Sequence, residues 1–230
     1  MARKAPPSRV ADLAAAATKV FTEKGYRRAL MSDVAAELGV SPGTLYRYVD
    51  GKEALFHFVF AYEVAEGHID EGDLPMARPL PGETLELVSK RLVRGTGVPR
   101  LRDALSRDVT DNAAAELAGI IEERYMLVAR NWRIHALIEK SAVDIPELFE
   151  MYFVRGRRRL SGGLARYLEK RTEAGYFRRV GDIATVARLI EEGATWFAWH
   201  RHGDPDTAGI DDDVARRTVV DTFVAALVAA

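Results

Sequence analysis

The sequence predicts an all-α protein built from two domains. Apolar residues recur at the three- and four-residue spacing of helices along most of the 230 residues, and almost nothing alternates at the two-residue period of strands. Glycine and proline separate these segments with start and stop signals typical of helices. A basic N-terminal quarter ahead of an acidic remainder favours two parts with different partners.

The composition excludes several classes of protein. Without cysteine there is no disulfide, no thiolate nucleophile, and no zinc or iron–sulfur centre held by cysteine. A spanning helix needs about 20 mostly apolar residues, and the best stretches, 10–21 and 214–230, are interrupted by charge. The N-terminus lacks the apolar core of a signal peptide. We expect a soluble cytoplasmic protein with no membrane partner and no cofactor.

Charge is divided unevenly along the chain. Residues 1–52 carry nine Lys or Arg against five acids, whereas residues 53–230 carry 24 against 29. The basic part predicts an anionic partner at the N-terminal end. Arg3 and Lys4, with Arg9 just beyond, form a short basic arm over residues 1–8 that either follows the minor groove or backbone of a nucleic acid or is disordered, with disorder favoured.

The first helix is predicted to end at Gly25, which follows Lys24. Its inward face carries apolar residues one and two turns apart. These are Val10, Leu13, Ala17, Val20 and Phe21.

Two shorter helices follow, separated by a tight turn. The second spans Asp33 to Leu38 and stops at Gly39, whose left-handed conformation ends helices. Ser41 is a good N-cap and Pro42 a good first residue for a third helix that runs through Tyr48. Residues 50–53 are predicted to form a capping box that opens a fourth helix. Leu45, Val34, Leu38 and Val40 supply the core.

This pattern is the outline of a helix-turn-helix. Four segments then resemble the N-terminal domain of the TetR family of bacterial transcriptional repressors, over about residues 9–56. They are Phe21 to Tyr26, Asp33 to Ser41, Gly43 to Tyr48 and Lys52 to Leu55. The resemblance implies a three-helix head whose third helix enters the major groove, and a dimer that reads two half-sites of an inverted-repeat operator in double-stranded DNA.

The resemblance also implies which residues touch DNA. Arg47 is the best candidate for reading bases, because a bidentate contact with guanine discriminates by about 1–3 kcal/mol. The alternative to a DNA contact is a solvated surface charge for Arg47 and a packing aromatic for Tyr48. The expected DNA-binding residues are Ser32, Ser41, Pro42, Gly43, Thr44, Tyr46, Arg47, Tyr48 and Lys52.

Two positions depart from the family pattern. Leu30 stands where the family usually has a threonine that caps the second helix and reaches a phosphate, and Val49 replaces the usual phenylalanine. The first departure puts one phosphate contact in doubt, and the second implies only different packing.

The rest of the chain predicts a helical body. A glycine- and proline-rich loop over 71–82 precedes it. We place a DNA-binding domain at 1–52 and an effector-binding and dimerisation domain at 53–230. The predicted body helices are about 83–95, 99–108, 112–140, 145–174, 182–202 and 211–229.

In the family, the last two long helices form the dimer interface, here about 182–202 and 211–229. Small residues between branched ones suit close helix packing, although the same faces would also serve as a monomer core. These residues are Ile183, Val186, Ala187, Ile190, Ala194, Phe197, Val214, Thr218, Val219, Phe223, Val224 and Leu227.

The family also binds a small molecule in its larger domain. An apolar concavity lined by aromatic residues would suit a hydrophobic effector, while core packing is the favoured alternative for any single aromatic. The candidates are Tyr125, Met126, Trp132, His135, Tyr152, Phe153, Trp196 and Trp199.

Other functions have less support. His200 and His202 lie near Glu191, Glu192 and Asp204, but histidines two apart on a helix point away from each other, which argues against a metal site. No nucleophile elbow, phosphate loop or HExxH motif indicates an enzyme. A helical interaction module would leave the basic head without a role. The sequence therefore predicts a DNA-binding regulator, most simply a repressor released by a ligand.

Overall fold

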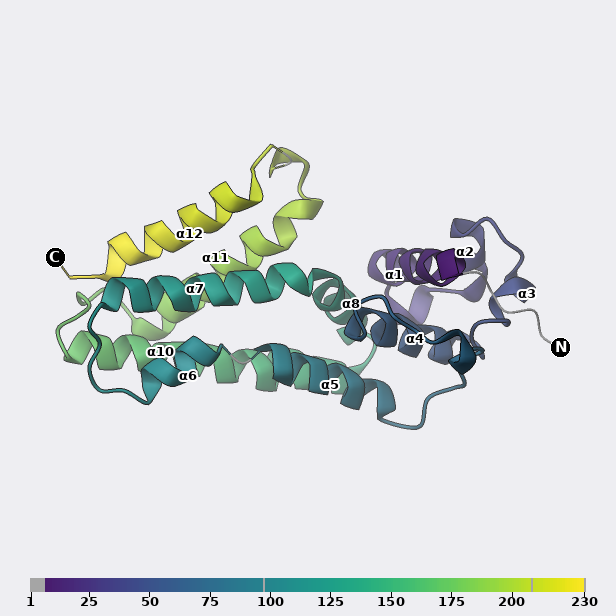
Figure 1. The fold of residues 1–230 in the computed structure, drawn as a ribbon, viewed down its shortest axis with the longest axis horizontal. Helices are drawn as coiled ribbons and strands as arrows, with labels where there is room; N and C mark the ends of the chain where they lie inside the picture. The colour runs from purple at the N-terminus through teal and green to yellow at the C-terminus, as the bar shows by residue number, and fades with distance from the viewer. Residues whose placement is uncertain (1–6, 97, 208, 230) are drawn as a thin grey trace. The chain divides into compact units, whose positions relative to one another are not determined.

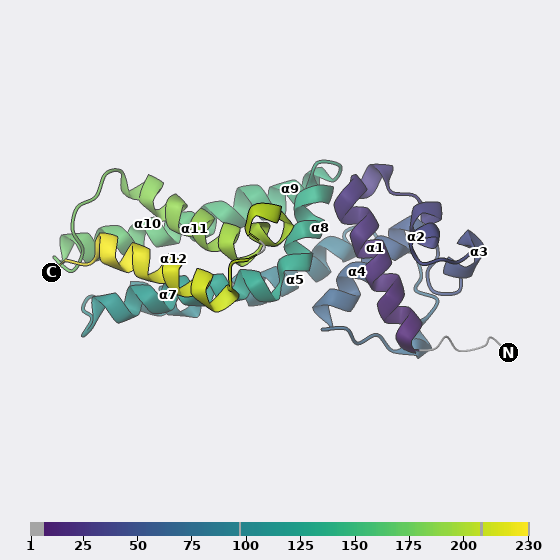
Figure 2. The same cartoon turned by 90° about the horizontal axis from the view of Figure 1, so that it is seen from above.

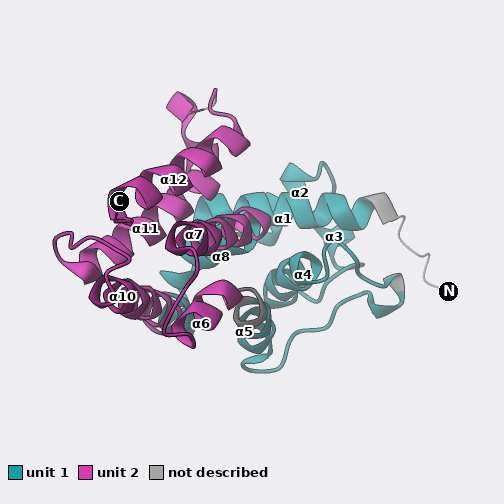
Figure 3. Cartoon of the chain, turned by 60° about the vertical axis from the view of Figure 1, so that its left-hand side comes forward, with its two compact units in different colours: residues 1–93, 133–152 teal, residues 94–132, 153–230 magenta. Residues whose placement is uncertain are grey.

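The computed structural model describes residues 7–96, 98–207 and 209–229. Within these ranges the chain is helical, and its β structure is limited to two isolated bridges, as the sequence predicts (Figures 1 and 2). The chain forms two compact units (Figure 3). Unit 1 contains residues 1–93 and 133–152, and unit 2 contains residues 94–132 and 153–230.

Helix α1, Pro7–Arg28, opens unit 1. The whole predicted inward face is buried, from Val10 to Phe21. Gly25 interrupts the helix with φ 79°, a left-handed conformation that only glycine adopts without strain. The predicted stop at this glycine is thus confirmed, although one more helical turn follows it.

Helices α2, Met31–Glu37, and α3, Pro42–Leu45, form the predicted pair. Helix α3 is shorter than predicted, because the amides of Arg47 and Tyr48 bond to carbonyls three residues back, at 3.2 and 2.9 Å. Such bonds tighten the chain into turns instead of continuing the α-helix.

Helix α4, Lys52–Val64, begins after Gly51, whose φ is 90°. The predicted capping box is wrong, because no side chain caps this helix and the Glu53 carboxylate pairs with Arg78 instead. A nearly continuous apolar run from Ala54 to Phe60 buries most of the helix.

The predicted loop is present, with one short 3₁₀ turn at Glu71–Asp73. Met76 pairs with the chain before α4: its amide donates to the Tyr48 carbonyl at 2.7 Å, and its carbonyl accepts from the Asp50 amide at 3.0 Å. These two bonds tie the loop to the turn that follows α3. Unit 1 is completed by most of α5, Glu83–Thr96, and of α8, Trp132–Ala142, and by α9, Pro146–Phe149.

Unit 2 is a layered helical bundle. Helix α11 packs against α7 and α10, and α12 lies along α7 and α11 (Figures 1 and 2). The short α6 packs against α7 and α10. Leu117, Ile121, Tyr167 and Ala194 are fully buried in the core between these helices. The bounds are α6 Pro99–Leu105, α7 Ala113–Arg130, α10 Arg157–Glu173, α11 Ile183–Ala198 and α12 Asp212–Leu227, with 3₁₀ turns at His200–Gly203 and Pro205–Thr207.

Two long predicted helices are each divided. The segment 112–140 breaks at Asn131, whose side-chain amide donates to the Leu127 carbonyl at 2.7 Å and so competes with the helix backbone. The segment 145–174 starts as α9, passes through a π-helical stretch at Glu150–Gly156 and continues as α10. Periodicity alone does not detect either interruption, because the apolar face continues across both.

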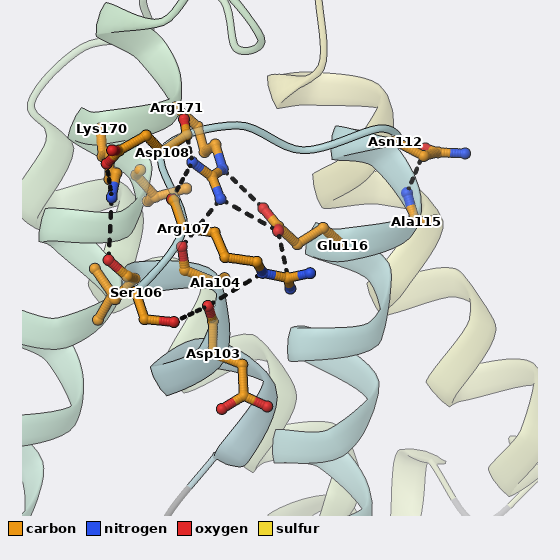
Figure 4. Close-up of polar contacts among 12 residues, drawn as sticks. Asp103, Ala104, Ser106, Arg107, Asp108, Asn112, Ala115, Glu116, Lys170 and Arg171 are labelled. Carbon is orange, nitrogen blue, oxygen red and sulfur yellow. Dashed lines mark hydrogen bonds and ion pairs between the residues drawn. The ribbon is translucent and has the colours of Figure 1, made fainter.

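A buried arginine of α10, Arg171, forms hydrogen bonds with the end of α6 and the α6–α7 connection (Figure 4). The Arg171 guanidinium donates to the carbonyls of Ala104, Arg107 and Asp108 at 3.0–3.2 Å, and to the Glu116 carboxylate. Glu116 raises the pKa of Arg171 mainly through this hydrogen bond, and burial raises the pKa of the adjacent Tyr167.

Among the described residues, no helix is both long enough and apolar enough to cross a membrane.

Candidate nucleic-acid interface

The turn between α2 and α3 has the geometry of a helix-turn-helix. Gly39 has φ 68°, and the Val40 amide closes the turn on the Ala35 carbonyl at 2.9 Å. Ser41 is extended ahead of Pro42, the first residue of α3. Leu45 is fully buried and fixes the helix on the head.

The predicted DNA-binding residues divide by exposure. Leu45 faces inward, while Ser41, Pro42, Gly43 and Arg47 are exposed, and the Tyr46 ring is 54% exposed. Ser32 is exposed in the first turn of α2. Thr44 is half-buried, and its hydroxyl lies 3.0 Å from that of Ser41.

Neither the backbone conformation nor the packing around Gly43 requires a glycine at this position. Its φ is not positive, and a Cβ placed there would meet only the Ser41 hydroxyl, at 3.9 Å. Gly39 and Gly51, in contrast, have positive φ. A glycine inside a helix costs up to about 1 kcal/mol relative to alanine. Close approach of an external molecule to the α3 backbone would account for this cost.

Tyr48 and Lys52 are engaged within the protein. Tyr48 is only 3% exposed, which fits the alternative interpretation of a packing aromatic. The Lys52 ammonium donates to the Arg27 carbonyl at 2.9 Å and lies 4.7 Å from the centre of the Tyr26 ring. Burial lowers the pKa of Lys52, while Asp144 opposes that shift. Lys52 thus joins the start of α4 to the end of α1.

The start of α2 lacks half of a capping box. Leu30 occupies the N-cap position without a side-chain acceptor, and it is 57% exposed. The Asp33 carboxylate accepts from the Leu30 amide at 3.0 Å and pairs with Lys24 at 2.8 Å. The Lys24 hydrogen bond, followed by the amide, lowers the pKa of Asp33. Val49 is fully buried, so the second departure from the family pattern is a packing change.

The predicted ligand residues lie in both units. His135 and Tyr152 belong to unit 1, where the Tyr152 hydroxyl is 2.7 Å from His135 Nδ1 and both side chains are buried. Six others belong to unit 2, among which the Tyr125 hydroxyl donates to the Phe197 carbonyl at 3.0 Å. Met126 and Trp132 are more than one-third exposed. The six are Tyr125, Met126, Trp132, Phe153, Trp196 and Trp199.

Sequence reasoning missed a buried charged cluster in unit 2. Glu191 is 1% exposed, and one of its carboxylate oxygens accepts from the Ser161 hydroxyl. Its other oxygen, Oε1, has no hydrogen-bond partner in the described part of the chain and lies 4.0 Å from Arg124 Nη2. Arg124 also donates to the Thr195 hydroxyl at 3.4 Å. The signal was available, because Glu191 stands on the apolar stripe of α11 between Ala187 and Ala194.

The histidines near the end of α11 show no metal-binding geometry. His202 Nε2 lies 3.7 Å from the Asp212 carboxylate, and burial, followed by Arg201, lowers its pKa. Among the residues that the structure describes, no three His, Asp or Glu side chains form a group that would hold a metal ion.

The two predicted dimer helices use part of their apolar faces within the chain. Five of the residues assigned to the interface are buried in the core of unit 2, where the alternative interpretation of a monomer core holds. On the same helices, Leu189 is 56% exposed and Val214 is 48% exposed. The five buried residues are Ala187, Ile190, Ala194, Val219 and Leu227.

Comparison with known proteins agrees with this geometry. Residues 13–59 match the family model of bacterial regulatory proteins of the tetR family. The chain is 28% identical over 182 residues to the uncharacterized HTH-type transcriptional regulator YfiR of Bacillus subtilis (strain 168), covering 79% of this chain and 74% of YfiR.

Two solved structures share the fold. The ketosteroid transcriptional regulator KstR2 of Mycobacterium tuberculosis aligns with a TM-score of 0.56 at 17% identity, and the alignment covers 100% of both chains. AibR in complex with isovaleryl coenzyme A and operator DNA aligns with a TM-score of 0.52 at 16% identity, covering 93% of this chain and 97% of AibR.

A helix-turn-helix at the N-terminal end of an all-helical chain defines a DNA-binding regulator. Residues 13–59 form a helix-turn-helix head of the TetR type, and the whole chain shares its fold with a solved transcriptional regulator.

Proposed function

We propose that the protein is a homodimeric repressor that binds an inverted-repeat operator and leaves it when a small ligand binds. The observation that carries the DNA-binding part is the exposed Pro42-Gly43 start of α3, where no contact within the described chain requires the glycine. Arg47, one turn further along, is exposed and is assigned to base reading. Contact with an operator also fits the expected cytoplasmic location.

The remaining predicted contacts are to the sugar-phosphate backbone. Ser32 and Ser41 offer hydroxyls, and Tyr46 offers an exposed ring with a hydroxyl. Contacts of this kind set the register of a protein on DNA without carrying sequence information. We assign Lys52 and Tyr48 a smaller part of the DNA contact. The Lys52 ammonium already donates to the Arg27 carbonyl, and the Tyr48 side chain is buried.

A dimer is needed to bind both half-sites of the operator. Two recognition helices must sit about 34–36 Å apart to enter successive major grooves on one face of the duplex. We assign the interface to the outward sides of α11 and α12, because Leu189 and Val214 are exposed there. The residues of α11 and α12 that face the core of unit 2 are not part of this interface.

A ligand response is supported by the interior of unit 2. Burying a charged group is costly unless the group is paired and fully hydrogen-bonded, and Glu191 Oε1 lacks a hydrogen bond among the described residues. An effector with a hydrogen-bond donor would satisfy it. The aromatic residues that the sequence predicts for the ligand site in unit 2, including Tyr125 and Trp196, would contact its apolar part. The AibR complex, which holds isovaleryl coenzyme A together with operator DNA, agrees with a small-molecule effector.

The ligand acts only by preferring one conformer. Equal affinity for the DNA-binding and released states would shift no population, however tight the binding. We therefore assign the effector a higher affinity for the released state.

The experiment that tests the function is selection of random duplex DNA by the purified full-length protein at near-physiological salt. Enrichment of an inverted repeat whose half-site centres lie one helical turn apart is the expected result. A Gly43→Val variant should lose that enrichment, whereas Val143→Ala, at an exposed position outside the head, should keep it. Enrichment of a single half-site would contradict the dimer, and a folded protein that enriches nothing would contradict the function.

A further inference from the structure

Unit 1 contains an open cleft of about 610 Å³ that the DNA-binding role does not use. Five segments line it: the end of α1, helix α4 from Glu53 to Phe60, the loop 78–82, the first turn of α5, and the α8–α9 connection with α9. Ligand sites in proteins commonly have volumes of about 300–1,000 Å³, so this cleft has the size of a binding site for a small molecule.

Aromatic rings form one wall of the cleft. The Phe56 ring lies 4.8 Å from the Tyr26 ring and 5.0 Å from the Phe60 ring, measured between centroids. Phe56 and Phe60 are almost completely buried, so these rings are held in place by packing. A fixed aromatic surface binds an apolar molecule without losing side-chain entropy of its own.

Aliphatic side chains supply the rest of the apolar lining. Leu85 contributes from α5, Ile145 from the connection before α9, and Leu148 from α9. Leu80 stands between Pro79 and Pro81 and is 74% exposed. An apolar molecule in the cleft would cover this leucine, which water now surrounds.

One ion pair supplies the charge in the cleft. The Arg78 guanidinium donates from Nη2 to Glu53 Oε1 at 2.9 Å, and its Nε pairs with the other carboxylate oxygen. Its Nη1 has no hydrogen-bond partner within residues 7–96, 98–207 and 209–229. A guanidinium has five N–H donors, so Nη1 can still donate to an oxygen of another molecule.

The geometry points to a binding site for a small apolar molecule that carries an acceptor oxygen at one end. The apolar body lies against Phe56, Leu85 and Leu148, and the oxygen accepts from Arg78 Nη1. A carboxylate and a neutral carbonyl both offer that oxygen. A primary amine does not, because its protonated nitrogen has no acceptor, and both carboxylate oxygens of Glu53 are already paired with Arg78.

The test uses three eight-carbon probes: octanoate, methyl octanoate and octylamine. Each is titrated into the full-length protein with isotope-labelled Leu and Ile methyl groups, and the methyl resonances are followed by NMR. The expected result is saturable shifts at Leu85, Ile145 and Leu148 with octanoate or methyl octanoate, and binding of octylamine at least about tenfold weaker. If octanoate binds and methyl octanoate does not, the acceptor is a carboxylate.

Three variants locate the site. Leu85→Trp fills the cleft and should weaken binding of the better probe at least about tenfold, and Ile145→Phe serves the same purpose if the first variant fails to fold. Arg78→Gln should weaken octanoate about tenfold while leaving octylamine unchanged or tighter. The matched controls are Val143→Trp, at an exposed position outside the cleft, and Lys90→Gln, whose partner is Glu86.

The inference goes beyond the proposed function and is measured without DNA. If all three probes leave the cleft methyls unshifted, or if octylamine binds as tightly as octanoate and methyl octanoate, the inference is overturned whether or not the protein enriches an operator. Probe binding by a protein that enriches no operator would overturn only the proposed function.

Discussion

The Arg171 guanidinium has no exposed surface and donates to both carboxylate oxygens of Glu116, at 2.8 and 3.2 Å. The same guanidinium donates to the Ala104 carbonyl at 3.0 Å. One side chain of α10 therefore satisfies a nearly buried carboxylate of α7 and a carbonyl at the end of α6.

Replacing Arg171 with methionine should lower the free energy of unfolding by about 3 kcal/mol, because the nearly buried Glu116 carboxylate keeps only its 3.6 Å ion pair with Arg107 and three backbone carbonyls lose their donor. Urea unfolding followed by circular dichroism measures the change. Arg179→Met, at an exposed position, should change stability by no more than about 0.5 kcal/mol. Equal effects of the two substitutions would refute a special role for Arg171.

Leu30→Thr should stabilise the head by about 1 kcal/mol, because the threonine hydroxyl completes the cap that Asp33 half provides. The measurement is again equilibrium unfolding. Val143→Thr is the control, since it also replaces an exposed apolar residue with threonine but lies outside a helix N-terminus. Equal gains in both variants would show that removal of exposed apolar surface, and not capping, is responsible.

Arg47→Ala should relax base preference at one position of each half-site, at a cost of about 1–3 kcal/mol in discrimination. Competition binding with operators mutated one base pair at a time measures this. Lys90→Ala, on α5 of the same unit, should leave the preference unchanged. A uniform loss of affinity for all operators in Arg47→Ala would instead assign Arg47 to a phosphate.

His57 should make the protein less stable in mild acid. Burial lowers its pKa below the ordinary 6.5, and its Nδ1 lies 2.9 Å from the Thr84 hydroxyl. As the pH falls below about 6.5, the unfolded chain takes up a proton before the folded protein does, so stability falls until the folded-state pKa is passed.

Replacing His57 with glutamine should reduce the slope of unfolding free energy against pH between 7.5 and about 5.5. His202, whose pKa is also lowered by burial, should retain part of that slope. His68→Gln is the control at an exposed imidazole. An unchanged slope in the His57 variant would show that its ionisation is not linked to folding.

Leu189→Glu should weaken the proposed dimer by about tenfold or more, because a charge replaces an exposed apolar side chain on α11. Sedimentation velocity over a range of concentrations measures the change. Val109→Glu adds the same charge at a 71% exposed position of unit 2 outside both helices, and it should leave the dimer intact. If both variants dimerise like the parent protein, the interface lies elsewhere.

Local sequence signals predicted most of the fold. The apolar face from Val10 to Phe21 and the stop signals at Gly25 and Gly39 act within one or two helical turns, so the sequence alone reveals them. The interruption at Asn131 was not predicted, because it depends on one side chain competing with the backbone inside an unbroken apolar pattern.

Long-range contacts account for what the sequence did not predict. Glu53 was assigned to a capping box because of its spacing from Asp50, yet it pairs with Arg78, which lies 25 residues further along the chain. The charge cluster around Glu191 joins three helices, and no local pattern places Ser161 or Arg124 beside it. The assignments of Ser32, Pro42 and Arg47 to DNA rest on the family resemblance, to which the structure adds their exposure.

The hydrogen bond from the Arg27 amide to the Asp144 carboxylate, at 2.7 Å, spans 117 residues of sequence. During synthesis on the ribosome, the Arg27 amide can therefore form this hydrogen bond only after the chain has been translated past α8 and Asp144 has emerged. A nascent chain that stalls before Asp144 carries a head whose first helix ends without this bond. Completion of the head is thereby coupled to translation of more than half of the protein.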